Sequence, residues 1–385
     1  LLYPGSLWQQ HWQTDEGCMV SRTAVDVSKV AEATSRQLAG GRTQRPQTYW
    51  AQSFAPSAEL DQVPRAVRVE LLRQFGSFSL AFSVAFQPHL KYFGDDRGYL
   101  AYRQRGGITF VLGDPICSPN RRAALLREFL LVHRRPSFVQ IGRDTAEELR
   151  GLGFFINEMG IDTRLDLATY SFAGKDKEWL RYADNWVSKR HYRIEEASIR
   201  QHEAEIVALS EAWRSTRTIK RKEVRFLSRP IVMEDEVDAR RFFLFDDQGR
   251  MLAFVFFDPV YAQQRVVGYV TCFKRRLPET TQYAEPAIMK RAIEVFQGEG
   301  REFVLLGLSP LANIEDRDFR CNRILHGSLR YYYRAGWLNR YFYNLEGHAQ
   351  YKARFRGTEE KVYYATPAWF NSYRLLALTS LCGVF

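Results

Sequence analysis

The 385-residue sequence lacks several features that mark common classes of protein. It has no run of about 18 consecutive apolar residues, so it encodes no membrane-spanning helix. No CxxC spacing occurs, which argues against a zinc site, and the cysteine count is odd for a disulfide framework. The cysteines are Cys18, Cys117, Cys272, Cys321 and Cys382. We therefore expect a reducing, cytoplasmic setting and no bound metal.

Acidic residues are in the minority. The chain has 55 Lys and Arg against 44 Asp and Glu, which gives a formal net charge of +11. An excess of this sign favours polyanionic partners such as tRNA or anionic lipid. A basic protein without such a partner is the alternative. The chain begins with Leu1 and not with methionine, which indicates a piece of a longer protein and leaves transmembrane helices upstream open.

Apolar periodicity is absent from most of residues 1–63, and we interpret this stretch as an arm. The hydrophobic content of the whole chain is 45%, and turn signals separate the predicted elements from residue 64 on; both indicate a globular fold. The 3.6-residue periodicity predicts helices over 65–75, 121–134, 145–152, 175–189, 202–213, 285–298 and 318–333. Short apolar or alternating runs predict strands over 99–103, 108–112, 138–141, 155–159, 163–167, 193–196, 242–246, 251–257, 266–273, 303–306, 341–344 and 361–365.

The order of these elements occurs twice. Alternating strands and helices are typical of an α/β fold, and the repeat predicts two modules of the same kind, over residues 64–200 and 201–368. The remaining residues, 369–385, are rich in aromatic and aliphatic side chains. They fit an amphipathic helix at a membrane interface or ordinary packing on the domain.

A basic run is the first candidate binding segment. Seven cations lie between Arg214 and Arg229, opposed only by Glu223. This density suits phosphates of nucleic acid or of lipid headgroups, and the sequence does not separate the two. The proposed polyanion-binding residues are Arg217, Lys220, Arg221, Lys222 and Arg225.

The loop over residues 275–283 follows a predicted strand and precedes a helix, yet it contains no glycine. Acetyltransferases that use coenzyme A have a glycine-rich loop at this place, whose N–H groups hold the pyrophosphate. The sequence therefore predicts a donor carried on a macromolecule, an aminoacyl-tRNA or an acyl carrier protein, and no separate cofactor. Arg275 and Arg276 could hold a phosphate, or be plain surface arginines.

Three cations alternate near the C-terminus. If the segment is extended, Lys352, Arg354 and Arg356 share one face, and cations that converge need an anion, such as a phosphate or a developing oxyanion. The alternative is a solvated basic strand with Tyr351 and Phe355 facing the core.

These segments together resemble the C-terminal catalytic domain of bacterial lysyl- and alanyl-phosphatidylglycerol synthases, over roughly residues 65–370. The motifs that carry the resemblance are Val111-Leu-Gly-Asp-Pro115, Met159-Gly-Ile-Asp-Thr-Arg-Leu-Asp-Leu167, Tyr170-Ser-Phe-Ala-Gly174, Gly307-Leu-Ser-Pro-Leu311, Phe342-Tyr-Asn-Leu-Glu-Gly347 and Tyr351-Lys-Ala-Arg-Phe355. The resemblance implies two fused acetyltransferase-like modules that share a tunnel. It also implies transfer of an aminoacyl group from a charged tRNA to a lipid headgroup, by peripheral contact with the cytoplasmic face of the inner membrane.

The resemblance assigns candidate roles to residues. The proposed catalytic residues are Lys352, Arg354, Arg275 and Tyr343, and the proposed substrate-binding residues are Arg356, Asn344, Ser309, His348 and Arg276. His348 is a possible base or a satisfied histidine. Two positions depart from the family pattern, because Cys272 and Arg340 stand where acidic residues are expected. The departures leave the acceptor lipid open.

Two other functions remain. One is a fatty-acyl transfer from an acyl carrier protein that makes an ornithine-type aminolipid. The other is a non-catalytic basic module bound to membrane or RNA. The sequence gives no indication of the oligomeric state, of the amino acid or acyl chain that is donated, or of a covalent acyl-enzyme.

Overall fold

The computed structural model describes residues 63–216, 225–335, 344–367 and 372–383. The predicted arm lies outside these residues except for Val63, and so do the predicted strand 341–344, apart from Asn344, and most of the basic run.

The first part of the chain alternates strands and helices, as the apolar periodicity predicts. Its elements are α2 (Arg65–Phe75), α3 (Ala81–Phe86), β1 (Lys91–Asp95), β2 (Gly98–Arg105), β3 (Ile108–Leu112), β4 (Ile116–Cys117), α4 (Pro119–Val132), β5 (Ser137–Ile141), α5 (Arg143–Gly151) and β6 (Phe155–Asp166). The sequence predicted two strands, over 155–159 and 163–167, where the structure has the single strand β6. The strand continues through Gly160, which adopts a positive φ of 143°.

The second part has the same character. Its elements are η1 (Lys175–Lys177), α6 (Glu178–Ser188), β7 (Arg193–Glu196), η2 (Ile199–His202), α7 (Glu203–Ser215), β8 (Arg240–Phe245), β9 (Met251–Ala262), β10 (Arg265–Arg276), α8 (Ala284–Gly298), β11 (Phe303–Pro310), α9 (Arg323–Arg334), α11 (Leu345–Ala353), β12 (Thr358–Thr366) and α12 (Ser372–Leu381).

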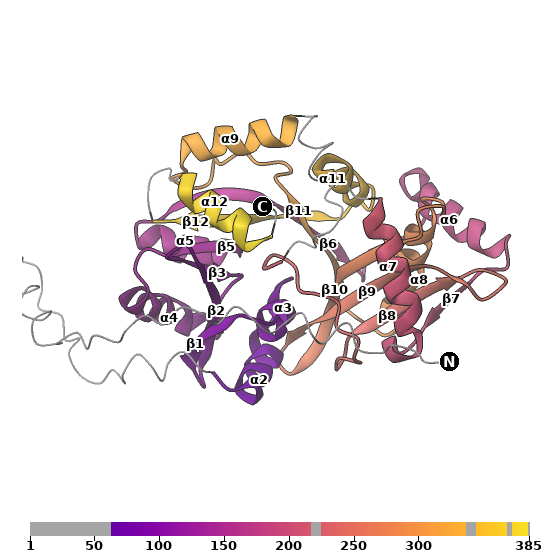
Figure 1. Ribbon diagram of the computed structural model, residues 1–385, viewed down its shortest axis with the longest axis horizontal. Helices are drawn as coiled ribbons and strands as arrows, with labels where there is room; N and C mark the ends of the chain where they lie inside the picture. Colours follow the sequence, from indigo (N-terminus) through magenta and orange to yellow (C-terminus); the bar gives the residue numbers. More distant parts are fainter. Residues whose placement is uncertain (1–62, 217–224, 336–343, 368–371, 384–385) are drawn as a thin grey trace, which may run out of the picture. The chain divides into compact units, whose positions relative to one another are not determined.

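All the strands belong to one sheet in the part of the chain that the structure describes (Figure 1). The order is β1-β2-β3-β5-β12-β6-β11-β10-β9-β8-β7, with β4 beside β2. Strand β6 pairs antiparallel with β11 and so joins the two parts. Strand β12, the last of the chain, lies between β5 and β6 and pairs antiparallel with both. The division into two modules at residue 200 stays a prediction. Strand β12 follows residue 200 in the sequence but pairs with β5 and β6, which precede it.

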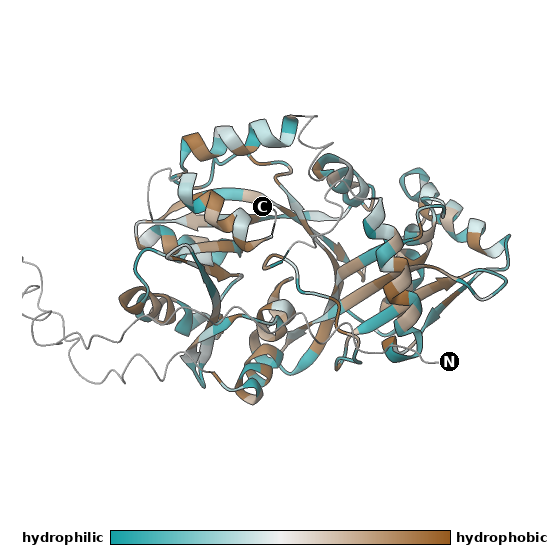
Figure 2. Ribbon diagram, viewed as in Figure 1, coloured by the Kyte–Doolittle hydropathy of each residue, from teal (hydrophilic) through white to brown (hydrophobic). Residues whose placement is uncertain are grey.

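Helices cover both faces of the sheet. In the first part, α4 and α5 pack on one face through Leu126, Phe129 and Leu149, whereas α2, α3 and α12 pack on the other. In the second part, α6 and α8 cover one face and α7 covers the opposite one. The strands carry the most apolar segments, such as β9 (Figure 2), whose residues are almost all buried. This arrangement is a mixed α/β fold, as the sequence predicts.

The C-terminal helix α12 packs on the sheet through Ala377 and Leu381, and the Arg374 guanidinium donates to Ser137 Oγ at 3.0 Å. Tyr373 and Leu376 remain exposed. The structure therefore shows packing on the domain, and interfacial binding stays a prediction. Within the described ranges, no helix has both the length and the apolar character needed to cross a bilayer.

Candidate active site where two parallel strands separate

The parallel strands β10 and β11 pair over only a short stretch. Their ladder joins Gly268–Val270 to Phe303–Leu305 and then ends. Both strands are irregular just beyond this point, because β10 shifts its register on β9 after Thr271 and β11 shifts its register on β6 after Leu305. Gly307 lies within the second irregularity with a φ of 75°. Backbone carbonyl groups that would otherwise bond across the pair are therefore free to accept other donors.

Lys352 supplies those donors. It comes from α11, whose first turn is capped by the Asn344 side chain accepting from Gly347 N–H at 2.9 Å. The Lys352 side chain is 3% exposed, and its Nζ donates to the carbonyl oxygens of Gly307 and Leu308, each at 2.7 Å. The amine thus lies at the point where the two strands separate.

A second lysine approaches the same place from β10. Lys274 Nζ is shielded from solvent and has no hydrogen-bond acceptor among the described residues. It lies 4.6 Å from the centroid of the Tyr351 ring. Tyr351 directly precedes Lys352, and its own hydroxyl is buried without a hydrogen-bond partner in the described structure. Several polar atoms are thus buried here without a protein partner among the described residues, and each calls for an explanation such as a catalytic role or a bound water or ion.

Burial and charge shift the ionisation of these groups. Burial, together with the Lys274 ammonium, lowers the pKa of Lys352 to about 7, although the Asp162 carboxylate opposes both effects. Burial also lowers the pKa of Lys274 to about 8, against the influence of Glu285. The buried Asp162 has a raised pKa, which the Lys352 charge and a hydrogen bond with Ser79 moderate. Strongly perturbed ionisable groups that cluster are typical of a functional site.

Comparison with known proteins assigns the family. Residues 69–366 match the family described as phosphatidylglycerol lysyltransferase, C-terminal. The chain belongs to this family. The resemblance inferred from the motifs is therefore confirmed.

Solved members of this type share the fold. L-PGS from Bacillus licheniformis is 19% identical, with a TM-score of 0.68 over 83% of this chain and 96% of that chain. The C-terminal domain of a putative lysylphosphatidylglycerol synthetase from Agrobacterium fabrum is 17% identical, with a TM-score of 0.66 over 84% of this chain and 99% of that chain. The mixed-sheet, acetyltransferase-like fold class is thereby confirmed, and the shared tunnel remains a prediction.

Curated relatives are longer than this chain. The phosphatidylglycerol lysyltransferase of Bacillus subtilis is 22% identical over 241 residues, which are 59% of this chain and 27% of that protein. The chain spans less than a third of the length of the curated relatives it matches.

The predicted convergence of three alternating cations is wrong. Lys352 belongs to helix α11, Arg354 follows its end, and Arg356 has a left-handed φ of 54°, so the segment is not extended. The Arg354 guanidinium lies 4.1 Å from the centroid of the Trp179 ring. Arg356 is exposed and pairs with Asp176 at 3.5 Å. Only Lys352 enters the site at the separated strands.

Arg275 does not join Lys352 either. Neighbouring residues on a strand face opposite sides, and Arg275 lies over the Trp213 ring of α7, 5.0 Å from its centroid. Arg276 returns to the face of Lys274, but its Nη1 donates to Thr280 O at 2.7 Å and its Nε lies 3.8 Å from Glu285. Arg276 therefore orders the loop in this structure.

The remaining residues predicted to bind substrate or to act in catalysis lie at different places in the fold. Asn344 caps α11, and His348 is half-buried one helical turn before Lys352. Ser309 is fully buried on β11, and its Oγ has no hydrogen-bond partner in the described part of the chain. Tyr343 lies outside the described residues, as do Arg217, Lys220, Arg221 and Lys222.

The last two cations of the basic run have different surroundings, and polyanion binding by Arg225 stays a prediction. Arg225 is exposed, and its backbone N–H donates to Cys382 O at 2.9 Å. Arg229 is buried, and its guanidinium bonds Asp258 at 2.6 Å and Glu236 at 2.7 Å. These carboxylates satisfy Arg229, so it is not available to a phosphate. The same Asp258 interacts with Cys272 and places a carboxylate beside the position where the family pattern has one.

Lys274 and Asp162 are site residues that the sequence reasoning missed. A signal for Lys274 was present, because the register that turns Phe273 and Arg275 toward one face of β10 turns Lys274 toward the other. Asp162 appeared only within the Met159–Leu167 motif. Its closeness to Lys352 depends on the pairing of β6 with β11, which no local pattern predicts.

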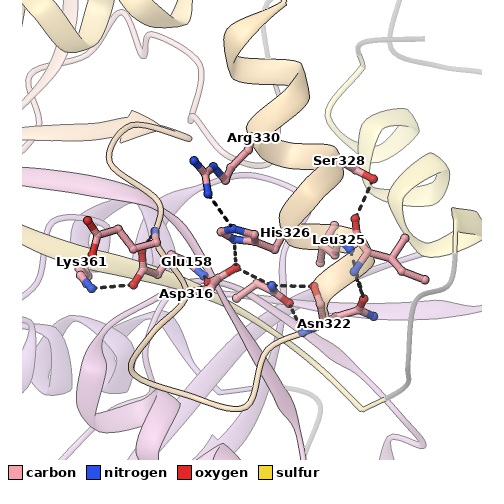
Figure 3. Close-up of polar contacts among 11 residues, drawn as sticks. Glu158, Asp316, Asn322, Leu325, His326, Ser328, Arg330 and Lys361 are labelled. Atoms are coloured by element: carbon pink, nitrogen blue, oxygen red, sulfur yellow. Dashed lines mark hydrogen bonds and ion pairs between the residues drawn. The ribbon is translucent and has the colours of Figure 1, made fainter.

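A second polar network fixes the loop before α9 (Figure 3). The Asp316 carboxylate accepts from Asn157 Nδ2 at 2.8 Å and from the Glu158 N–H, and His326 Nδ1 lies 2.7 Å from it. Glu158 in turn accepts from Lys361 at 2.7 Å. These contacts link the loop to β6 and β12, and they have a supporting role. Within the described residues, no group of three or more His, Cys, Asp or Glu side chains could hold a metal ion.

Proposed function

We propose that this chain transfers an aminoacyl group from a charged tRNA to a hydroxyl of phosphatidylglycerol, at the cytoplasmic face of a membrane. The observation that carries the proposal is the buried Lys352 amine at the separation of β10 and β11, in a chain that belongs to the phosphatidylglycerol lysyltransferase family.

The chemistry suits these residues. An aminoacyl ester is already activated, so the protein has mainly to position the two substrates and to stabilise charge. Lys352 is the catalytic residue in this proposal. Its amine is held by two carbonyl groups, and the hydroxyls of the adjacent Tyr351 and of Ser309 are buried without partners among the described residues. No covalent acyl-enzyme is needed.

Binding of the substrates requires phosphate recognition. Arg354 is exposed beside the site, lies over Trp179, and forms no ion pair with a carboxylate in the described part of the chain. A guanidinium in this state suits a phosphate of the lipid or of the tRNA end. The excess of 55 Lys and Arg over 44 Asp and Glu adds a general attraction for both.

The test is a reconstituted reaction. Purified protein is mixed with vesicles of phosphatidylglycerol and with tRNA that carries a radiolabelled amino acid, and lipids are separated by thin-layer chromatography. We expect a labelled lipid that disappears after ribonuclease treatment of the donor. Lys352→Met should lower the rate on the order of 100-fold or more, the usual effect of removing a group that acts in the transition state.

Lys91→Met is the matched control, since Lys91 is exposed on the edge strand β1; it should retain the full rate. Acyl transfer from acyl carrier protein, insensitive to ribonuclease, would replace the proposal with the fatty-acyl alternative. Membrane or RNA binding without any new lipid would replace it with the non-catalytic one.

A further inference from the structure

Two lysines share a buried place with little opposite charge. The groups that face Lys352 are Lys274 from β10 and Asp162 from β6. Those that face Lys274 are Lys352, the Tyr351 ring of α11 and, more weakly, Glu285 of α8. Tyr351 also faces Arg354 and Tyr170, and Asp162 also faces Glu360. Two ammonium groups so placed repel, and the cheapest relief is to deprotonate one of them.

The hydrogen bonds indicate which lysine is neutral. A neutral amine has two N–H donors and one lone pair, whereas an ammonium has three donors and no acceptor. Lys352 Nζ has two acceptors in place, Gly307 O and Leu308 O. A neutral Lys352 is thus fully satisfied as a donor, and its lone pair is free to take a proton.

Lys274 has the opposite surroundings. Its Nζ has no carbonyl or carboxylate acceptor among the described residues, so the acceptor that its N–H groups need must come from a ligand, such as a developing oxyanion. It faces the Tyr351 ring at 4.6 Å, and the face of an aromatic ring attracts a cation. The geometry favours charge on Lys274. The pKa values of about 7 for Lys352 and about 8 for Lys274 follow the same order.

We propose that Lys274 and Lys352 act as a catalytic pair, in which Lys352 is the general base and the Lys274 ammonium stabilises the oxyanion. The inference rests on the proposed function and adds to it a second catalytic residue and a proton path.

The step balances without a further reactant. The lipid hydroxyl oxygen attacks the ester carbonyl carbon, a C–O bond forms, and the hydroxyl proton moves to the Lys352 lone pair. The carbonyl oxygen becomes an oxyanion next to the Lys274 ammonium. The tetrahedral intermediate then collapses, the ester bond to the tRNA ribose breaks, and the ribose oxygen takes the proton from Lys352. Both lysines return to their starting states.

The first readout is the pH dependence of kcat/KM. The unaltered protein should gain activity as pH rises through about 7, because Lys352 must be neutral, and should lose it again above about 8, because Lys274 must stay charged. In Lys274→Met the rising limb should move to higher pH, because a repelling charge is gone. The fall above about 8 should disappear, and the maximum rate should drop about 100-fold. In Asp162→Asn the limb should move to lower pH. Lys274→Arg keeps the charge and should leave the limb in place.

The second readout needs no substrate. In protein labelled with ¹³C-lysine, the Lys352 signal is assigned by its loss in Lys352→Arg, and its pKa is followed by NMR. It should rise in Lys274→Met, fall in Asp162→Asn and stay unchanged in Lys274→Arg. Near-ultraviolet circular dichroism confirms that each variant is folded.

The outcomes separate the two proposals. If the pKa of Lys352 is unchanged in Lys274→Met, or is near that of an ordinary surface lysine, the proposed catalytic pair is overturned even if lipid is aminoacylated. The expected pKa changes combined with no aminoacyl transfer would leave the pair in place electrostatically and overturn the proposed reaction. If Lys274→Met does not fold, a Lys274→Arg variant with a displaced limb overturns the pair.

Discussion

Gly307 shows how a single position can shape the site. Its φ of 75° lies in the left-handed region, and a Cβ built there would be 3.5 Å from Thr271 O and 3.8 Å from Lys352 Nζ. We expect Gly307→Ala to lower the free energy of unfolding by about 1 kcal/mol, because L side chains resist this conformation. The rate of transfer should fall as well, because the new methyl group would lie in van der Waals contact with the Lys352 amine, 3.8 Å away, and would exclude substrate atoms from that side. Denaturant unfolding and the vesicle assay measure the two effects.

Gly249→Ala is the matched control for this prediction. Gly249 has a φ of 81° in the turn between β8 and β9, and a methyl group added there would meet open space. It should lose a similar amount of stability and keep the full rate. Equal losses of rate in both variants would mean that strain alone, and not contact with Lys352, explains the effect.

Individual side chains were only partly predictable. Lys352 stood out in the sequence because it is one of three closely spaced cations. Lys274 did not, because it is followed directly by Arg275 and Arg276, which have the same charge, and the sequence does not distinguish the three. Which of three consecutive cations faces the site depends on the bulge at Thr271–Phe273, and a one-residue shift of register exchanges the two faces of a strand.

At the scale of elements, α11 carries Lys352, the lysine that we propose to be catalytic, and its cap is Asn344. The side-chain oxygen accepts from Gly347 N–H, so Asn344→Ala should destabilise the protein by about 1 kcal/mol. Asn344→Asp keeps the acceptor and adds a charge that suits a helix N-terminus. We therefore expect Asn344→Asp to retain stability and rate, as measured by thermal unfolding and the vesicle assay.

This comparison separates two roles of Asn344. The family resemblance predicts that Asn344 binds substrate. If it does so by donating its amide N–H group, Asn344→Asp will lose rate although the protein stays stable. A cap alone predicts no such loss.

The elements themselves were mostly predictable, since apolar periodicity depends on a few neighbouring residues. Strand β3 and helix α2 have the predicted bounds. The segment around Lys352 was not, because Lys-x-Arg-x-Arg alternates as a strand would. The helix is favoured by Asn344 before it and ends at Ala353. Four residues later, Gly357 passes close to β6, where a Cβ would be 2.5 Å from Arg164 O. That approach is tertiary and has no local signature.

For the whole molecule, the position of β12 is decisive. It pairs with both β5 and β6, so a chain ending at residue 357 lacks a central strand and should not unfold cooperatively. A chain ending at residue 367 keeps β12 and loses α12, whose Ala377 and Leu381 are buried. We expect it to fold with reduced stability. Near-ultraviolet circular dichroism during denaturation distinguishes the two, and cooperative unfolding of the shorter chain would contradict this prediction.

The arrangement of strands was the least predictable property. The sequence indicates two successive α/β modules. It does not show that the last strand, β12, pairs with strands β5 and β6 of the first module. The two parts are also joined by backbone bonds from Tyr261, Gln263 and Gln264 of the β9–β10 hairpin to the end of α2. Such pairings connect residues nearly two hundred positions apart, and each depends on the rest of the fold being present.

The return of β12 has a consequence for biosynthesis. The neighbours of this strand, β5 and β6, are translated roughly 200 residues before it, and until it leaves the ribosome their facing edges have no permanent partner. Exposed strand edges invite pairing with other chains. Nascent polypeptides of this protein therefore carry a vulnerable intermediate through most of their synthesis, and a chaperone that shields strand edges would determine how many of them mature.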